Sequence, residues 1–171
     1  MKFAAASVTA LLVSTAHAFP NEPTGFRGLE WGDTIAARGD EFVLRQSSRD
    51  TQLFTRKGDK LAIGEAALSD ISYAFYRGRF HAAAIKTQGG GNGKALFDAF
   101  LTQYGNAATP NRSANRYYWG GATALISLDC MPDYLNCMAV IASKRIADER
   151  RADENAAADR AKGDVQRKPD P

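Results

Sequence analysis

Cysteine and histidine are scarce in this sequence, which restricts the metal and redox chemistry open to it. The chain of 171 residues contains two cysteines and two histidines. A structural zinc site needs four ligands, mostly of these two types. Cys130 and Cys137 also stand too far apart to form a Cys-x-x-Cys redox motif. We therefore expect neither a metal ion nor a cofactor.

A large excess of charge and a long apolar run are also missing. The formal net charge is +3, and basic residues alternate with acidic ones, as in "TRKGDK" at residues 55–60. Such a balance provides no electrostatic attraction for nucleic acid or for an anionic membrane. No segment approaches the roughly 20 consecutive apolar residues of a transmembrane helix. We expect no nucleic-acid partner and no membrane span.

The N-terminal segment has the three parts of an export signal. Lys2 supplies a positive charge, residues 3–13 are apolar, and "AHA" at residues 16–18 places small residues at a signal-peptidase site. These features predict a signal peptide over residues 1–18, cleaved after Ala18. The mature protein is expected to be soluble and periplasmic, beginning at Phe19.

An oxidising compartment changes the interpretation of the two cysteines. Cys130 and Cys137 flank the loop "MPDYLN", which contains a Pro-Asp turn signal. Paired cysteines of an exported chain usually form a structural disulfide. We predict a disulfide between Cys130 and Cys137.

Hydrophobic periodicity predicts an α+β fold. Residues 70–87 alternate between large apolar and small residues around Arg77-Gly78, which indicates a β-hairpin. Apolar residues over 92–104 recur at helical spacing, with Asn92 expected as the N-cap and Gly105 as the C-cap. We expect an antiparallel sheet of about six or seven strands, with this helix packed on one face. Residues 19–146 should form this single domain.

Three further local predictions concern the first half and the C-terminal end of the chain. Asp33 is expected to cap a short helix over residues 34–38, and Gly58-Asp59 to form the turn between two hairpin partners. Residues 147–171 should form a charged, alanine-rich helix followed by a disordered tail, because they provide no apolar stripe to bury. Alternatively, this segment binds a partner.

The glycine-rich connection before the main helix is a weak candidate site. "QGGGNGKA" at residues 88–95 resembles a phosphate-binding loop, but Gln88 and Ala95 replace the required glycine and hydroxyl residue. The connection is therefore expected to be structural. A weak anion site at Asn92, Gly93 and Lys94 stays open, because helix N-termini attract anions.

Residues suited to catalysis are not grouped in the sequence. His81 is the one histidine after the predicted cleavage site, and no nucleophile stands near it. The acidic residues considered for a carboxylate pair are Glu30, Asp70, Asp129 and Asp133, which are dispersed. We therefore expect a protein without catalytic residues. A small hydrolase with a carboxylate-based site is the alternative.

Aromatic residues are the remaining signal. In "GLEWGDT", residues 28–34, Leu29 and Trp31 alternate like strand residues, and we interpret this stretch as the start of the folded domain. In "RYYWGG", consecutive aromatics cannot all face inward, because strand residues alternate between faces. Tyr76, Tyr118 and Trp119 are the candidate contacts of a ligand or partner.

Four segments together resemble small exported bacterial proteins of unknown function. They are "FRGLEWGDT", "ISYAFYRGRF", "ALFDAFLTQYG" and "YYWGGATALISL", and the resemblance covers residues 24–143. The order of elements is more distantly similar to outer-membrane-assembly lipoproteins and to the β-lactamase-inhibitor-like fold. The more distant likeness implies a binding role by analogy. Together with the export signal and the dispersed acidic residues, we expect a periplasmic, non-enzymatic binding or envelope-associated module with an unknown protein or envelope component as partner. An accessory subunit that docks through its C-terminal helix is a further alternative.

Overall fold

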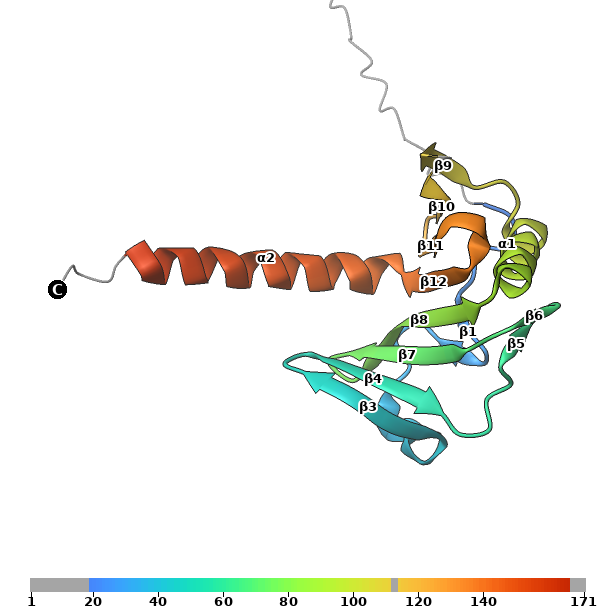
Figure 1. Ribbon diagram of the computed structural model, residues 1–171. Coiled ribbons are helices and arrows are strands. Elements are labelled where there is room, and N and C mark those ends of the chain that lie inside the picture. The colour runs from blue at the N-terminus through green and yellow to red at the C-terminus, as the bar shows by residue number, and fades with distance from the viewer. Residues whose placement is uncertain (1–18, 112–113, 167–171) are drawn as a thin grey trace, which may run out of the picture.

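The computed structural model describes residues 19–111 and 114–166 and combines one large sheet with two α-helices (Figure 1). The strands are β1 Gly25–Phe26, β2 Leu29–Glu30, β3 Phe42–Ser48, β4 Thr51–Arg56, β5 Ala62–Ile63, β6 Ala66–Ala67, β7 Asp70–Tyr76, β8 Arg79–Gln88, β9 Ala108–Asn111, β10 Arg116–Gly120, β11 Ala124–Cys130 and β12 Asn136–Ser143. The helices are α1 Gly90–Tyr104 and α2 Lys144–Gln166, with short 3-10 turns at Ile35–Ala37, Gly39–Glu41 and Pro132–Tyr134. The predicted signal peptide and the last residues of the tail lie outside the described residues.

The large sheet has eight strands in the order β3-β4-β7-β8-β12-β11-β10-β9, and every pair is antiparallel. The chain runs from β3 to β8, crosses through α1 to the far edge, and returns from β9 to β12 beside β8. Two small hairpins, β1–β2 and β5–β6, stand apart from the sheet. The predicted α+β class is confirmed, and the short edge strand β9 brings the sheet to eight strands.

One face of the sheet carries the core. A cross-strand row of buried residues runs over five strands: Ile71, Ile85, Ala139, Leu128 and Tyr117. The neighbouring row on the same face is Tyr73, Ala83, Ile141, Ile126 and Trp119. Successive strand residues point to opposite faces of the sheet, so every second residue of these strands lies on the face that α1 covers. The residues of both rows are apolar, as expected for side chains buried on that face.

Helix α1 covers these rows through Leu96 and Phe100, both of which are buried. The helix ends as predicted, with Gly105 at φ 73° donating to the Leu101 carbonyl. Its N-cap is Gly89, however, so the prediction of Asn92 as the cap is wrong. The glycine-rich sequence lets the helix begin at Gly90, two residues before Asn92, because Gly89 adopts φ 84°.

The predicted disulfide is confirmed. Cys130 and Cys137 stand directly opposite each other on β11 and β12, with Cα atoms 4.1 Å apart. The start of α1 packs closely on this corner, where a Cβ on Gly93 would lie 2.1 Å from the Tyr134 carbonyl oxygen. The disulfide therefore joins two neighbouring strands at the point where α1 contacts the sheet.

Two local predictions in the first half of the chain are wrong. The strand β4 pairs with β3 and β7, whereas the chain after Gly58 forms the separate β5–β6 hairpin. Asp33 makes no cap bond to a helix; its carboxylate accepts the Glu30 N–H at 3.0 Å and closes a turn. Asp33 thus closes a local turn instead of capping a helix, whereas the partners of β4 were set by contacts distant in sequence.

Helix α2 begins directly after β12 and extends away from the sheet (Figure 1). Ile146 in its first turn is fully buried, and polar contacts hold the helix against the β7–β8 hairpin. The Tyr76 hydroxyl donates to Asp153 at 2.6 Å, and Arg79 pairs with Glu149 at 2.6 Å. The predicted charged C-terminal helix is present, and polar contacts in place of an apolar stripe hold it to the hairpin.

Truncating α2 at two positions separates its docked part from its exposed part. A chain ending at Ala147 lacks Glu149 and Asp153 and uncovers Tyr76, so we expect its melting temperature to fall by roughly 5 °C. A chain ending at Arg160 keeps these contacts and should melt within about 1 °C of the full chain. Calorimetry of both variants checks this, and equal melting temperatures would show that the docking contacts contribute nothing.

Candidate binding surface on the open face of the sheet

The face of the sheet opposite α1 is largely uncovered, and we call it the open face. Its first cross-strand row is Asp70, Lys86, Met138, Asp129 and Arg116. The second is Ser72, Ala84, Val140, Ser127 and Tyr118, and the third is Ala74, Ala82, Ala142, Leu125 and Gly120. The polar row lies near the disulfide, and α2 covers the opposite end.

A groove of about 920 Å³ lies over the polar row. Among its lining residues are Lys86 and Arg116, which are exposed, and two exposed apolar side chains, Tyr118 and Met138. A smaller apolar hollow of about 300 Å³ continues from Tyr118 over the second and third rows. The groove thus combines charge, hydrogen-bonding groups and apolar contact area, as protein interfaces do.

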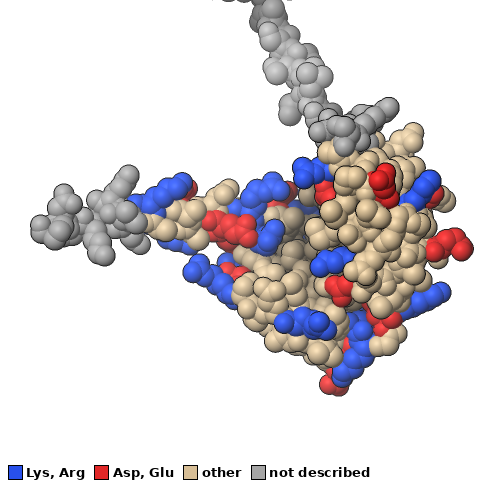
Figure 2. Space-filling view, in the orientation of Figure 1, with Lys and Arg blue, Asp and Glu red and all other residues tan. Residues whose placement is uncertain are grey.

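The groove carries both signs of charge: Lys86 and Arg116 are basic and Asp129 is acidic. Arg116 pairs with Asp129 at 3.0 Å, with 61% and 37% of the two side chains exposed. Such an exposed pair is worth little to stability and is available for exchange with a ligand. On the face of the molecule drawn in Figure 2, basic and acidic side chains are likewise interspersed.

The three predicted contact residues have different positions. Tyr118 lies on the open face and is 39% exposed, as expected. Trp119 is 2% exposed and donates its indole N–H to the Gly105 carbonyl, so the expectation that it faces a partner is wrong. Neighbouring strand residues point to opposite faces, and Tyr118 and Trp119 cannot share one.

Tyr76 is the second correction. It does face away from α1, but α2 covers it and leaves it 2% exposed. Its hydrogen bond to Asp153 raises the pKa of the hydroxyl to about 12, together with the burial of the ring. Tyr76 therefore holds α2 and is not available to a partner in this structure. Three lining residues of the groove were not predicted from the sequence: Lys86, Arg116 and Met138. Arg116 could have been found, because it stands two residues before Tyr118 on the same strand and therefore shares its face.

The weak anion site at Asn92, Gly93 and Lys94 is occupied by the protein's own groups. The Asn92 side chain accepts the Ala67 N–H at 3.1 Å and donates to the Gln88 carbonyl at 2.9 Å. Lys94 pairs with Asp98 at 2.9 Å. Asn92 and Lys94 thus make contacts within the protein, and Asn92 joins α1 to β6.

His81 lies beneath α2, next to the ring of Tyr76. Neither ring nitrogen has a hydrogen-bond partner among the described residues, and the residue is 6% exposed. Burial, together with the positive charge of Arg150, lowers the pKa of His81 to about 4. The side chain is therefore neutral and buried, and it lies away from the groove.

The acidic residues considered for catalysis are not brought together. Asp70 and Asp129 belong to the same row, but β8 and β12 stand between their strands, a separation of roughly 14 Å. Glu30 lies in the N-terminal segment and Asp133 in the disulfide loop. Within residues 19–111 and 114–166, no group of three His, Cys, Asp or Glu side chains is placed to hold a metal ion.

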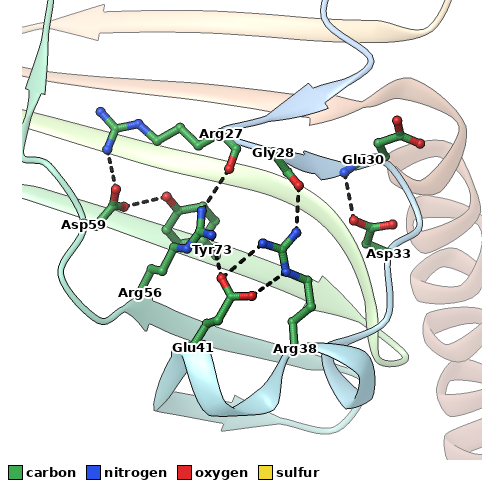
Figure 3. A network of polar contacts seen from close by, with 9 residues as sticks. All are labelled: Arg27, Gly28, Glu30, Asp33, Arg38, Glu41, Arg56, Asp59 and Tyr73. Atoms are coloured by element: carbon green, nitrogen blue, oxygen red, sulfur yellow. Dashed lines mark hydrogen bonds and ion pairs between the residues drawn. The ribbon is translucent and has the colours of Figure 1, made fainter.

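The "GLEWGDT" stretch is held by an internal polar network (Figure 3). The Arg27 guanidinium donates to Asp59 at 2.5 Å and to the carbonyls of Lys60 and Ala62. Asp59 also accepts the Tyr73 hydroxyl at 2.5 Å. Burial, reinforced by this bond, raises the pKa of Tyr73 far above its usual range. Arg27 thereby joins the N-terminal segment to the loop that precedes β5.

A second part of the network is centred on Glu41. Its carboxylate accepts from Arg38 at 2.7 Å and from Arg56 at 2.5 Å, and these bonds lower its pKa. The other ends of the two guanidiniums donate to the carbonyls of Gly28 and Arg27. All these charged groups are used within the protein, so the network is structural. The interpretation of "GLEWGDT" as the start of the domain fits these contacts.

In the parts of the chain that the structure describes, no helix is long and apolar enough to cross a membrane. Comparison of the chain with protein-family models, with curated proteins and with solved structures finds no match.

Proposed function

We propose that this protein is a non-enzymatic binding module of the bacterial periplasm that holds a segment of a partner protein on its open face. The groove over the polar row carries this proposal, because it offers Lys86, Arg116 and Asp129 beside the exposed side chains of Tyr118 and Met138. A polypeptide presents both signs of charge, amides and apolar groups. A lining of the same mixed kind complements it.

The disulfide and the anchoring of the residues after the predicted cleavage site support export. The ring of Phe19 contacts Tyr104 edge-on, at 5.7 Å between centroids. Glu22 accepts hydrogen bonds from Thr123 and Ala124, which lower its pKa against the opposing effect of burial. Cleavage after Ala18 would leave all these contacts in place. Mass spectrometry of the protein from a periplasmic fraction should find Phe19 as its first residue.

Photo-crosslinking at position 118 tests the binding site. A photoreactive phenylalanine in place of Tyr118 should give a discrete adduct with a partner in periplasmic extract. The same probe at Leu61, an exposed residue just before β5, is the matched control and should give none. Because Tyr118 is exposed, Tyr118→Ala should keep the fold while lowering partner recovery at least about tenfold. Unchanged recovery would contradict the proposed site.

Docking through α2 is the second candidate, because its outer half projects from the domain (Figure 1). Ala158 is exposed there and makes a suitable probe position. An adduct formed from position 158 and none from position 118 would favour this alternative over the open face.

A further inference from the structure

A pocket of about 650 Å³ lies between α1 and the β5–β6 hairpin, separate from the groove of the open face. Its floor includes Phe100 and Ile141, whose side chains belong to the core. Phe26, Ile63 and Tyr104 contribute further apolar wall. Pockets of this volume and composition accept small molecules with a large apolar surface.

Small residues keep this space open. Ala95 and Ala99 stand one turn apart on α1 and both line the pocket. At the tip of the hairpin, a Cβ on Gly64 would lie 3.5 Å from the Cβ of Ala99, so the hairpin tip reaches the helix. Larger side chains at positions 95 or 99 would occupy the volume that is now empty.

The wall formed by the hairpin is fixed before any ligand binds. Arg27 holds the Ala62 carbonyl at 2.7 Å on one strand, and Asn92 holds the Ala67 N–H at 3.1 Å on the other. Both strands contain only two residues, so these side-chain bonds, not a long ladder, position the hairpin. A preformed pocket loses less ordering entropy when it binds a ligand.

The polar part of the lining is acidic. Glu65 and Asp98 contribute the charged groups, and Thr102 and Gln103 add neutral polar ones. Asp98 is paired with Lys94, whereas Glu65 has no ion-pair partner in the described part of the chain. The charge beside the apolar floor is thus negative, which favours a cationic head group and disfavours an anionic one.

We propose that this pocket binds a small cationic amphiphile, with its apolar chain over Phe100 and Ile141 and its head group near Glu65. Decyltrimethylammonium and decanoate, both below their micelle concentrations, are the two probes. Calorimetric titration of the full chain should show the cation binding at least about fivefold more tightly than the anion. Amide shifts confined to Gly64, Ala95 and Ala99 should place the bound chain.

Two variants, Ala99→Leu and Glu65→Gln, test whether the amphiphile binds in this pocket. Ala99→Leu fills the pocket and should weaken decyltrimethylammonium about tenfold or more. Ala158→Leu on the exposed part of α2 is the matched control and should have no effect. Glu65→Gln leaves the pocket open and should reduce the preference for the cation even if Ala99→Leu folds poorly. Equal affinity for both probes, or a Glu65→Gln variant with unchanged preference, would overturn the proposal.

Discussion

Lowering the pH from 7 to 5 should cost the protein about 2 kcal/mol of stability, and His81→Leu should remove most of this loss. His81 is neutral and buried, and its pKa lies near 4 compared with 6.5 for an accessible histidine. Above pH 6.5 both the folded and the unfolded protein hold this histidine uncharged. As the pH falls from 6.5 towards 4, only the unfolded chain takes up the proton, so folding becomes less favourable.

The charged groups around His81 make its protonation unfavourable. Arg150 of α2 is the nearby positive charge, and its buried Nε has no hydrogen-bond partner within the described residues. Tyr76 presents its ring edge-on to the imidazole, with centroids 6.3 Å apart. Glu149 and Asp153 are engaged by Arg79 and Tyr76. Among the residues that the structure describes, no acceptor is thus positioned to stabilise an imidazolium.

Urea titrations at several pH values check this prediction, with the chain that begins at Phe19. The carboxylates with lowered pKa, Glu22 and Glu41, affect stability only below about pH 4.5. The interval from pH 7 to 5 therefore reports the histidine. If His81→Leu shows the same slope as the natural chain, the assignment to His81 is wrong. The imidazole resonance of His81 should titrate well below pH 6.5.

Asp59→Ala should destabilise the protein by about 2–3 kcal/mol, more than the loss of any exposed ion pair. The Asp59 side chain is 11% exposed and accepts from both Arg27 and Tyr73. Its removal leaves a guanidinium that is 21% exposed and a buried hydroxyl without their partner. It also loosens the start of the domain, because the Arg27–Asp59 ion pair is one of the contacts that join that segment to the chain before β5.

Asp98→Ala is the matched control for this change. Asp98 pairs with Lys94 on α1, but 54% and 64% of the two side chains are exposed. Water screens such a pair, so its loss should cost less than about 0.5 kcal/mol. Urea denaturation of both variants gives the comparison. Equal losses for Asp59→Ala and Asp98→Ala would show that the network in Figure 3 adds nothing beyond a surface pair.

Strand alternation explains both the successful and the wrong site predictions. The pattern "RYYWG" alternates exposed and buried along β10, so Tyr118 faces outward and Trp119 inward. Choosing both as contacts contradicted the two-residue period. Tyr76 obeys that period and does face away from the core. It is nevertheless buried, because α2 packs over it and contacts it through Asp153, 77 residues later in the chain. Local sequence carries no information about such a cover.

The sequence by itself determined the features that depend on neighbouring residues. These are the β7–β8 hairpin with its Arg77-Gly78 turn, the end of α1 at Gly105, and the disulfide between two strands joined by a short loop. Hydrophobic periodicity, glycine conformation and loop length depend on residues that are close together in the sequence. They can therefore be recognised without knowledge of the tertiary structure. The α+β class follows from the same signals.

Only the tertiary structure decided which elements meet. It paired β4 with β3 and β7 and joined β12 to β8. It also docked α2 through ion pairs, which the sequence pattern of α2 did not predict because this helix lacks an apolar stripe. It also brought Lys86, Met138 and Arg116 into one row and opened a pocket between α1 and the β5–β6 hairpin. These contacts join residues far apart in the chain. Their formation depends on the burial and charge of the whole fold, which no single segment encodes.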